Sequence, residues 1–187
     1  MTQQTGSVAR LPNVQTMVMT AGQATETRDD DARLADLYDR YSARLYRFAL
    51  RVSRQDAEAK DLVHDAFMRA ARDLRRVPEG DGALAWLLRV IVNLVRDRHR
   101  RTLVREAFAR LTGRASHDPR EALDSGATVR AALASLPPRQ RAVVALHHLD
   151  DEPVPAIAAL LGLSPATVRW HLAAARKRLA VLLKGPV

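Results

Sequence analysis

The C-terminal part of the chain carries short apolar helical segments separated by tight turns. Residues 156–161 are strong helix formers. They follow Pro155, which is tolerated early in a helix because the N–H that it lacks would have been unpaired there. Gly162 suits the left-handed position just past a helix end, and Ser164 can cap the next helix through its hydroxyl. The pattern predicts two steeply crossing helices joined by a very short turn, the form of a helix-turn-helix.

The helix expected after Ser164 has one apolar side and one basic side. Apolar residues recur in steps of four and three, close to the helical period of ~3.6, so this side faces the core: Val168, Leu172, Ala175, Leu179 and Leu182. The opposite side carries Ala166, Arg169, Trp170, Ala173 and Lys177, with His171, Arg176 and Arg178 at its flanks. A solvated surface normally mixes charges, but no carboxylate occurs after Glu152. We interpret the basic side as a DNA-binding face, with a solvated face as the alternative.

Helical periodicity is also nearly continuous over residues 29–101, interrupted at 53–56 and 77–82. A helix expected at 56–74 places six apolar residues on its core side: Ala59, Val63, Ala66, Phe67, Ala70 and Leu74. Its other side carries Glu58, Asp61 and Asp65. This acidic patch is either an ordinary surface, on which Asp65 pairs with Arg69 one turn later, or a protein-docking surface.

A second helix is expected at 83–101, with an apolar face and a strongly basic end. Its apolar residues are Trp86, Val90, Ile91 and Leu94, and its basic end holds Arg96, Arg98, His99, Arg100 and Arg101. The helix dipole favours one or two cations at a C-terminus, but this cluster exceeds that need. Phosphate contact is therefore favoured over plain solvation.

These patterns divide the chain into two helical blocks. Residues 1–28 are polar and aperiodic and are expected to form a disordered tail. Residues 29–101 form the first block and 127–187 the second. The linker at 102–126 begins with a candidate helix and continues through Gly, Ser and Asp-Pro. With no strand-like alternation, the expected fold is all-α, two small helical domains joined by a flexible linker.

Charge and composition narrow the class of partner. The formal charge is +9 and the pI is near 11.0, which favours a polyanion, with nucleic acid first and an anionic membrane surface second. The absence of Cys excludes a disulfide scaffold, Cys zinc sites and thiol catalysis. No apolar run approaches the ~20 residues of a membrane span, and no signal peptide is evident. We expect a cytoplasmic protein without membrane insertion and without a metal or other cofactor.

Four segments carry a family resemblance. Residues 61–70, Asp-Leu-Val-His-Asp-Ala-Phe-Met-Arg-Ala, resemble region 2.2 of bacterial sigma-70 family factors, and residues 85–93, Ala-Trp-Leu-Leu-Arg-Val-Ile-Val-Asn, resemble their regions 2.3 to 2.4. Residues 136–141, Leu-Pro-Pro-Arg-Gln-Arg, open a stretch similar to region 4.1, and 157–178 are similar to region 4.2. Since no room remains for a region 3 domain, the chain most resembles the two-domain extracytoplasmic-function (ECF) sigma factors.

The resemblance implies promoter selection by a region 2 helical bundle and a region 4 helix-turn-helix, with no bond chemistry by the chain itself. Core RNA polymerase (its beta-prime clamp helices and beta flap) and promoter DNA are the implied partners, and an anti-sigma protein is a candidate partner. The positions matching polymerase docking are Asp61, His64, Asp65, Met68 and Arg72. Those matching minus-ten DNA contact are Arg76, Trp86, Arg89, Asn93, Arg96 and Arg100. Those matching minus-thirty-five contact are Ser164, Thr167, Arg169, Trp170, His171, Ala173, Arg176, Lys177 and Arg178.

Two other functions compete with this interpretation. A sigma-like or LuxR-type regulator would share the helix-turn-helix and bind DNA or an anti-sigma protein without programming polymerase, but it leaves residues 56–101 unexplained. An enzyme hypothesis would start from residues 147–152, His-His-Leu-Asp-Asp-Glu, whose side chains are of metal-binding types. Adjacent histidines on a helix point ~100° apart, and the His-Glu-x-x-His spacing is missing, which disfavours a metal site.

Overall fold

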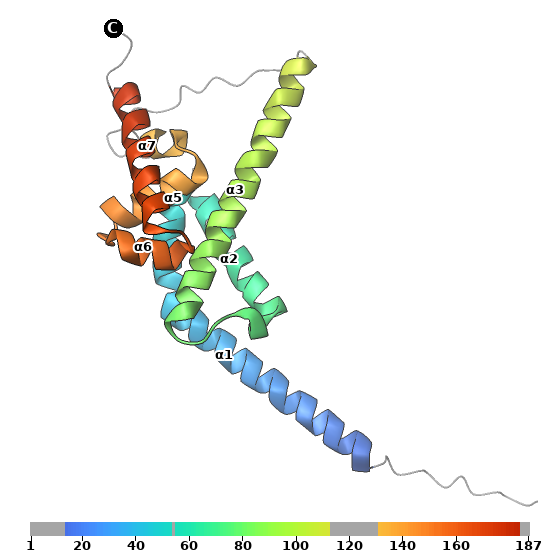
Figure 1. Ribbon diagram of the computed structural model, residues 1–187. Coiled ribbons are helices and arrows are strands. Elements are labelled where there is room, and N and C mark those ends of the chain that lie inside the picture. Colours follow the sequence, from blue (N-terminus) through green and yellow to red (C-terminus); the bar gives the residue numbers. More distant parts are fainter. Residues whose placement is uncertain (1–13, 54, 113–130, 184–187) are drawn as a thin grey trace, which may run out of the picture.

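The computed structural model describes residues 14–53, 55–112 and 131–183, and side chains from Arg28 to Val181 within those ranges. The described residues form helices and turns, with no strand among them. In chain order the elements are α1 (Val14–Val52), α2 (Asp56–Arg72), the short 3-10 helix η1 (Leu74–Arg76), α3 (Asp81–Leu111), α5 (Pro138–His148), α6 (Val154–Leu161) and α7 (Pro165–Leu183) (Figure 1). Residues 131–135 form a further helical stretch before α5. The all-α prediction is confirmed.

Helix α1 is longer than the sequence pattern predicted. It begins at Val14, so the prediction of a disordered tail is wrong for residues 14–28, while residues 1–13 lie outside the described part. The C-terminal half of α1 is anchored in the core through Leu45, Phe48 and Val52. Once that half is helical, each further helical residue costs little free energy, and no proline stands between Pro12 and the end of α1.

Helix α2 packs along α1 with the predicted side inward. All six predicted core positions are buried, and Leu62 is buried with them. The helix ends at Arg72 rather than Leu74, because the backbone tightens into η1. Leu74 nevertheless stays in the core, at 5% exposure. The acidic side of α2 therefore faces away from α1 and remains on the surface.

The loop between η1 and α3 is held by side chains of α1. Arg33 donates hydrogen bonds to the carbonyl oxygens of Leu74 (3.3 Å) and Val77 (2.6 Å), and the Tyr41 hydroxyl donates to Gly80 O at 3.3 Å. Gly80 has φ 57° and ψ −138°, a conformation that residues with a side chain avoid. These contacts fix the direction in which α3 leaves the loop.

Helix α3 runs from Asp81 to Leu111, well past the predicted end at Arg101. It absorbs the first part of the predicted linker, because no glycine or proline stands between Gly82 and Gly113. Residues 102–111 are thus helical, in line with the candidate helix expected there. Residues 113–130, which hold the rest of the predicted linker up to 126 and the first residues of the second block, lie outside the described part.

The second block packs directly against the first. Helix α5 contacts α1 and α3, and α6 contacts α3, so the buried residues of both blocks form one continuous core (Figure 1). Arg141 of α5 is 3% exposed and donates hydrogen bonds to the carbonyls of Leu133, Ala134 and Leu136, and to Val52 at the end of α1. One guanidinium thus satisfies carbonyls at two helix ends and ties the blocks together.

Candidate nucleic-acid and polymerase interfaces

The turn between α6 and α7 has the predicted geometry. Gly162 adopts the left-handed conformation (φ 64°, ψ 42°), and Leu163 N donates to Ala158 O at 2.9 Å. Ser164 Oγ accepts the Thr167 N–H at 3.1 Å, which caps the helix that begins at Pro165. The stop and restart of the helix are therefore set locally, and they aim the first turns of α7 at solvent.

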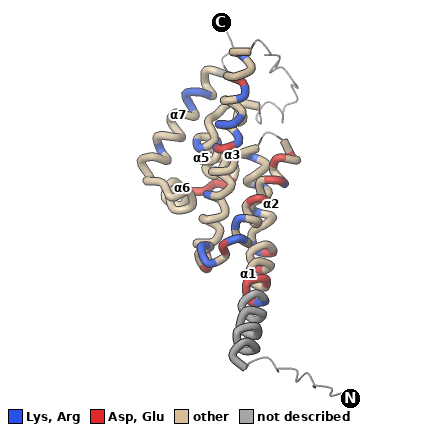
Figure 2. Tube along the Cα trace, turned by 90° about the vertical axis from the view of Figure 1, so that its right-hand side faces the viewer, with Lys and Arg blue, Asp and Glu red and all other residues tan. Residues whose placement is uncertain are grey.

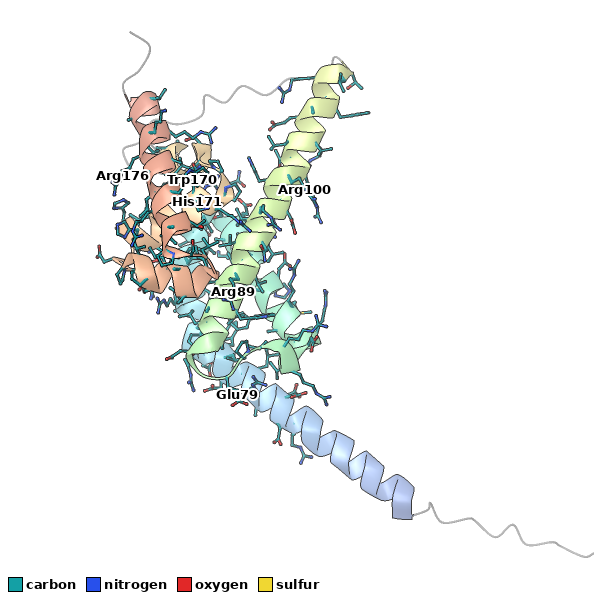
Figure 3. All side chains as sticks on the ribbon, in the orientation of Figure 1. Glu79, Arg89, Arg100, Trp170, His171 and Arg176 are labelled. Carbon is teal, nitrogen blue, oxygen red and sulfur yellow. The ribbon has the colours of Figure 1, made fainter. Side chains whose placement is uncertain are left out.

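Helix α7 presents the predicted outward side. Val168, Leu172 and Ala175 are buried, whereas the opposite side is exposed and includes Trp170 at 62% exposure. The exposed residues of this α7 face are Arg169, Trp170, Ala173, Arg176, Lys177 and Arg178. Figure 3 labels Trp170 and Arg176 on this helix. A large aromatic ring among cations, with no carboxylate on the helix, suits contact with a polyanion.

His171 does not lie at the flank of this face, and that part of the prediction is wrong. Its ring is 8% exposed, and its Nδ1 has no hydrogen-bond partner among the described residues. Burial, and secondarily the positive charge of Arg139, lower the pKa of His171 below its ordinary value of 6.5. The Trp170 ring stands edge-on to it, with centroids 4.9 Å apart. His171 therefore lies in edge-on contact with Trp170 and is not part of the exposed side of α7.

The five predicted polymerase-docking residues share the outer side of α2. Asp61, His64, Met68 and Arg72 are exposed, Met68 at 42%, and Asp65 is partly exposed. Beside them an open groove of about 330 Å³ runs between α1 and α2, lined by Tyr38, Ser42, Ala43, Tyr46, Lys60, Val63 and His64. The sequence pattern did not single out Tyr38. Its ring packs on that of Phe67, with the ring centroids 5.0 Å apart, and the residue remains 54% exposed. The signal available in the sequence was an aromatic side chain close to the start of the first helical block.

Asp65 pairs across helices rather than along its own. Its carboxylate accepts a hydrogen bond from Arg98 of α3 at 2.9 Å, and Glu58 lies 3.9 Å from the same guanidinium. The one-turn pair with Arg69, one of the two alternatives for this patch, is thus replaced by a bridge between α2 and α3. The Asp65 side chain is still 45% exposed, so the bridge leaves it accessible to a partner.

The predicted minus-ten residues are distributed over η1 and α3. Arg89, Asn93, Arg96 and Arg100 follow one another in steps of four, three and four, so they share one side of α3. Arg89 and Arg100 are labelled on this helix in Figure 3. Trp86 is partly buried against the core, and Arg76 is exposed beside Asp73, with which it pairs at 2.6 Å.

The second block covers part of this side of α3. Arg89 is partly buried, and a Cβ atom placed on Gly162 would lie only 3.5 Å from Arg89 Cδ. The α6–α7 turn therefore rests on α3 at Arg89. Asn93, Arg96 and Arg100, further along the helix, are exposed.

Charges of the two signs are unevenly distributed over the molecule. Carboxylates gather along α1 and α2, whereas α7 carries only basic charges (Figure 2). On α1 and α2 the carboxylates alternate with arginines and a lysine, so the one-signed charge of α7 is the clearer feature.

No metal centre was found among the described residues, where no group of three or more His, Asp or Glu side chains is placed to hold an ion. The acidic residues after α5 pair with arginines instead: Glu152 with Arg44 at 2.6 Å, and Asp150 with Arg51. None of the helices in the described part of the chain is long and apolar enough to cross a bilayer.

Comparison with known proteins decides the family. The profile for Sigma-70 region 2 matches residues 37–106, and the profile for Sigma-70, region 4 matches residues 127–179. The chain belongs to the sigma-70 family, in the ECF class. The sigma factor is 30% identical to the RNA polymerase sigma factor CarQ of Myxococcus xanthus, over 79% of its own chain and 87% of CarQ. It is 29% identical to the ECF sigma factor SigM of Mycobacterium tuberculosis, over 86% and 82% of the two chains.

A solved structure gives the same result for the fold. The sigma factor is similar to CnrH, solved in complex with the cytosolic domain of CnrY, with a TM-score of 0.54 and 27% identity over 84% of this chain and 91% of CnrH. The resemblance noted from the sequence is confirmed for both regions. The sigma factor therefore binds core RNA polymerase and directs promoter recognition in transcription initiation.

Proposed function

We propose that the sigma factor reads the minus-thirty-five element with the exposed side of α7. The observation that carries this proposal is the α7 face itself: Arg169, Trp170 and Ala173 project from the first turns of a capped helix. An arginine can contact a guanine edge through two hydrogen bonds, and Ala173 leaves room for close approach. Arg176, Lys177 and Arg178 follow in the next turn, where they are suited to phosphates.

Base readout and phosphate contact predict different mutant behaviour. Arg169→Ala should relax discrimination among minus-thirty-five sequences, with a cost on the order of 1 to 3 kcal/mol on the preferred sequence. Trp170→Ala should relax it as well. Arg176→Ala, the matched control, should weaken binding to all sequences alike and lower the salt dependence. Competition binding of duplex variants at several salt concentrations measures the sequence discrimination and the salt dependence of each variant. If Arg169→Ala lowers the affinity for all sequences equally, that result would count against base readout.

For the minus-ten element, we assign Asn93, Arg96 and Arg100 of α3, together with Arg76, Trp86 and Arg89. Support comes from the shared side of α3 and from the loop before it, which Arg33 and Tyr41 hold in place. Arg89 is the member that the second block partly covers.

Polymerase docking is assigned to the outer side of α2, with Asp61, His64, Asp65, Met68 and Arg72, and the adjoining Tyr38. Acidic residues bordering exposed Met68 and Tyr38 suit a basic, partly apolar helical partner such as the beta-prime clamp helices. Asp61 is the sharpest probe because it is exposed and pairs with no cation among the described residues. Beta flap contact is assigned to the second block.

Charge reversal tests the docking surface. Asp61→Lys should weaken binding to core polymerase by about tenfold or more, as expected for one charge at a complementary interface. Asp39→Lys makes the same charge change at an exposed position of α1 and should leave the affinity unchanged. Both chains should keep their helical circular dichroism. If Asp61→Lys and Asp39→Lys bind core enzyme with equal affinity, the assignment of polymerase docking to α2 is wrong.

The complete function is tested by reconstitution with core polymerase and a genomic promoter library. Run-off transcripts from a defined promoter class are expected; binding to DNA without transcripts would favour the regulator alternative. We assign no bond chemistry to the chain, and we place it in the cytoplasm with its partners. An anti-sigma protein remains a proposed partner; CnrH, which is similar in fold, was solved bound to another protein, the cytosolic domain of CnrY.

A further inference from the structure

The last turns of α3 carry an exposed apolar stripe that none of the assigned functions uses. It consists of Leu103 (49% exposed), Val104 (64%), Ala107, Phe108 (67%) and Leu111 (86%), here called the α3 stripe. In Figure 1 these turns project beyond the other helices. Side chains of this size are costly to leave in water when they lie together, so a contiguous apolar strip marks a surface that meets a partner.

The stripe continues the minus-ten side of the same helix. The series Arg89, Asn93, Arg96 and Arg100 extends, in the same steps of four and three, to Val104, Ala107 and Leu111. One side of α3 is thus polar and basic up to Arg100 and apolar beyond it. DNA phosphates can bind the basic part up to Arg100, but they have no attractive interaction with the apolar part beyond it. The stripe therefore begins where DNA contact ends.

Basic residues border the stripe. Arg101 and Arg105 follow one edge, and no carboxylate of the described residues pairs with either. They help to line an open groove of about 880 Å³ beside α2, formed by Glu58, Arg98, Arg100, Arg101, Thr102, Val104 and Arg105. Arg98 is already neutralised by Asp65 and Glu58, so Arg101 and Arg105 are the groove cations available to bind an acidic partner. Arg110 stands on the other edge, 3.9 Å from Glu106.

We propose that the α3 stripe docks an acidic amphipathic helix of a separate regulatory protein. The apolar side of that helix would cover Val104, Phe108 and Leu111, and its carboxylates would reach Arg101 and Arg105. This is recognition of a helix on an apolar strip, with charges setting the orientation. The proposal rests on the proposed function in leaving α2 to polymerase, and α7 and the basic part of α3 to DNA.

Two other occupants fit the charges and composition less well. A second copy of the chain would bring the arginines of one stripe against those of the other, and like charges across an interface repel. The chain's own residues 113–130 contain few large apolar residues, Leu123 and Val129, which is too little to cover the stripe. A separate acidic partner supplies both the apolar area and the opposite charge.

Two synthetic helical peptides test the chemistry of the site. Both have the same leucine side, one bordered by glutamates and the other by lysines, and each is titrated into the full chain by fluorescence anisotropy. The glutamate peptide should bind at least about tenfold more tightly, because only it complements the arginines. Equal affinities would reduce the stripe to a nonspecific apolar surface and overturn the proposal.

Variants locate the binding to the stripe. Val104→Ser with Phe108→Ser should abolish binding of the glutamate peptide, and Arg105→Glu should shift the preference toward the lysine peptide. Val181→Ser on α7, also an exposed apolar position (70%), is the matched control and should change nothing. All these positions are exposed, so circular dichroism should show unchanged helix content. Undiminished binding by the double variant would overturn the proposal.

The natural partner is sought by placing p-benzoylphenylalanine at position 108 in the producing cell. A crosslink to an acidic, amphipathic segment of a protein other than a polymerase subunit supports the proposal. Crosslinks only to DNA, to polymerase or to a second copy of the chain would overturn the proposal. Loss of run-off transcription in the Val104→Ser, Phe108→Ser variant would overturn it as well. Failure of transcription by the unaltered chain would instead count against the proposed function, so the two failures are distinguishable.

Discussion

At the scale of single residues, His171 is the group whose protonation the fold most clearly constrains. It is buried on α7, where desolvation and Arg139 lower its pKa below the ordinary 6.5. Protonation would leave an N–H at Nδ1 without an acceptor among the described residues. The folded chain therefore prefers the neutral ring, whereas the unfolded chain takes up a proton with an ordinary pKa.

The sign of the resulting pH dependence follows directly. The stability gained from the neutral His171 ring is complete above about pH 6.5 and is lost as the pH falls through that value toward the lowered folded pKa. His171→Leu should therefore flatten the fall in the free energy of unfolding between pH 7 and about pH 5, measured by urea denaturation. His148, whose pKa is lowered by burial and by His147, should account for a remaining slope.

Parallel profiles for His171→Leu and the parent would show that the buried ring is not responsible.

At the scale of elements, the turn between α6 and α7 depends on one left-handed residue. Gly162→Ala should destabilise the second block by about 1 to 2 kcal/mol, the cost of holding an L-residue in that conformation. Gly162→Asn should cost less, because asparagine tolerates it. A Cβ here meets Arg89 only at ordinary contact distance, so the difference reflects the backbone rather than a clash. Urea denaturation measures the free energy of unfolding of both variants. An equal loss of stability in Gly162→Ala and Gly162→Asn would contradict this explanation.

Features with a local cause could be predicted from the sequence. The glycine and serine of this turn, the core side of α2 and the exposed side of α7 all follow from residues within a few positions of one another. The ends of α1 and α3 could not be placed, because a helix anchored in a core continues through polar sequence until a breaker stops it. The apolar pattern ends earlier than the helix does.

Contacts between distant segments were out of reach of the sequence pattern. The burial of His171, the bridge from Asp65 to Arg98 and the reach of Arg141 to Val52 depend on which helices come together. Periodicity assigns a residue to a side of its own helix, but it does not say which other helix covers that side. Most of the candidate DNA and polymerase residues are exposed, as the periodicity predicted, whereas His171 is buried and Asp65, Trp86, Arg89 and Thr167 are partly covered. Their roles stay predictions.

At the scale of the whole molecule, the two blocks pack too closely to reach both promoter elements. Helix α6 contacts both α3 and α7, which places the two DNA faces within roughly two helix-packing distances, on the order of 20 Å. The minus-ten and minus-thirty-five elements are about 25 base pairs apart, or about 85 Å at ~3.4 Å per base pair. With α3 and α7 on the two elements as proposed, we expect the blocks to separate for initiation, breaking the ion pairs Arg44–Glu152 and Arg51–Asp150.

A crosslink between the blocks should prevent transcription without unfolding the protein. Because the chain has no cysteine, Arg44→Cys with Glu152→Cys can be joined by a short bismaleimide without side reactions at other thiols. The joined chain should yield no run-off transcripts, while the unreacted double variant should be active. Tyr46→Cys with Asp56→Cys, joined within the first block, is the control and should remain active. Full activity of the chain joined between blocks would show that separation is unnecessary.

The overhang of α3 sets how far the second block can travel after separation. From Arg100 to Leu111 the helix adds about 17 Å of rigid rod, at ~1.5 Å per residue. That rod supplies about 17 Å of the roughly 85 Å between the two promoter elements in the proposed arrangement. The length of one helix thus limits the spacing between elements that this factor can accept.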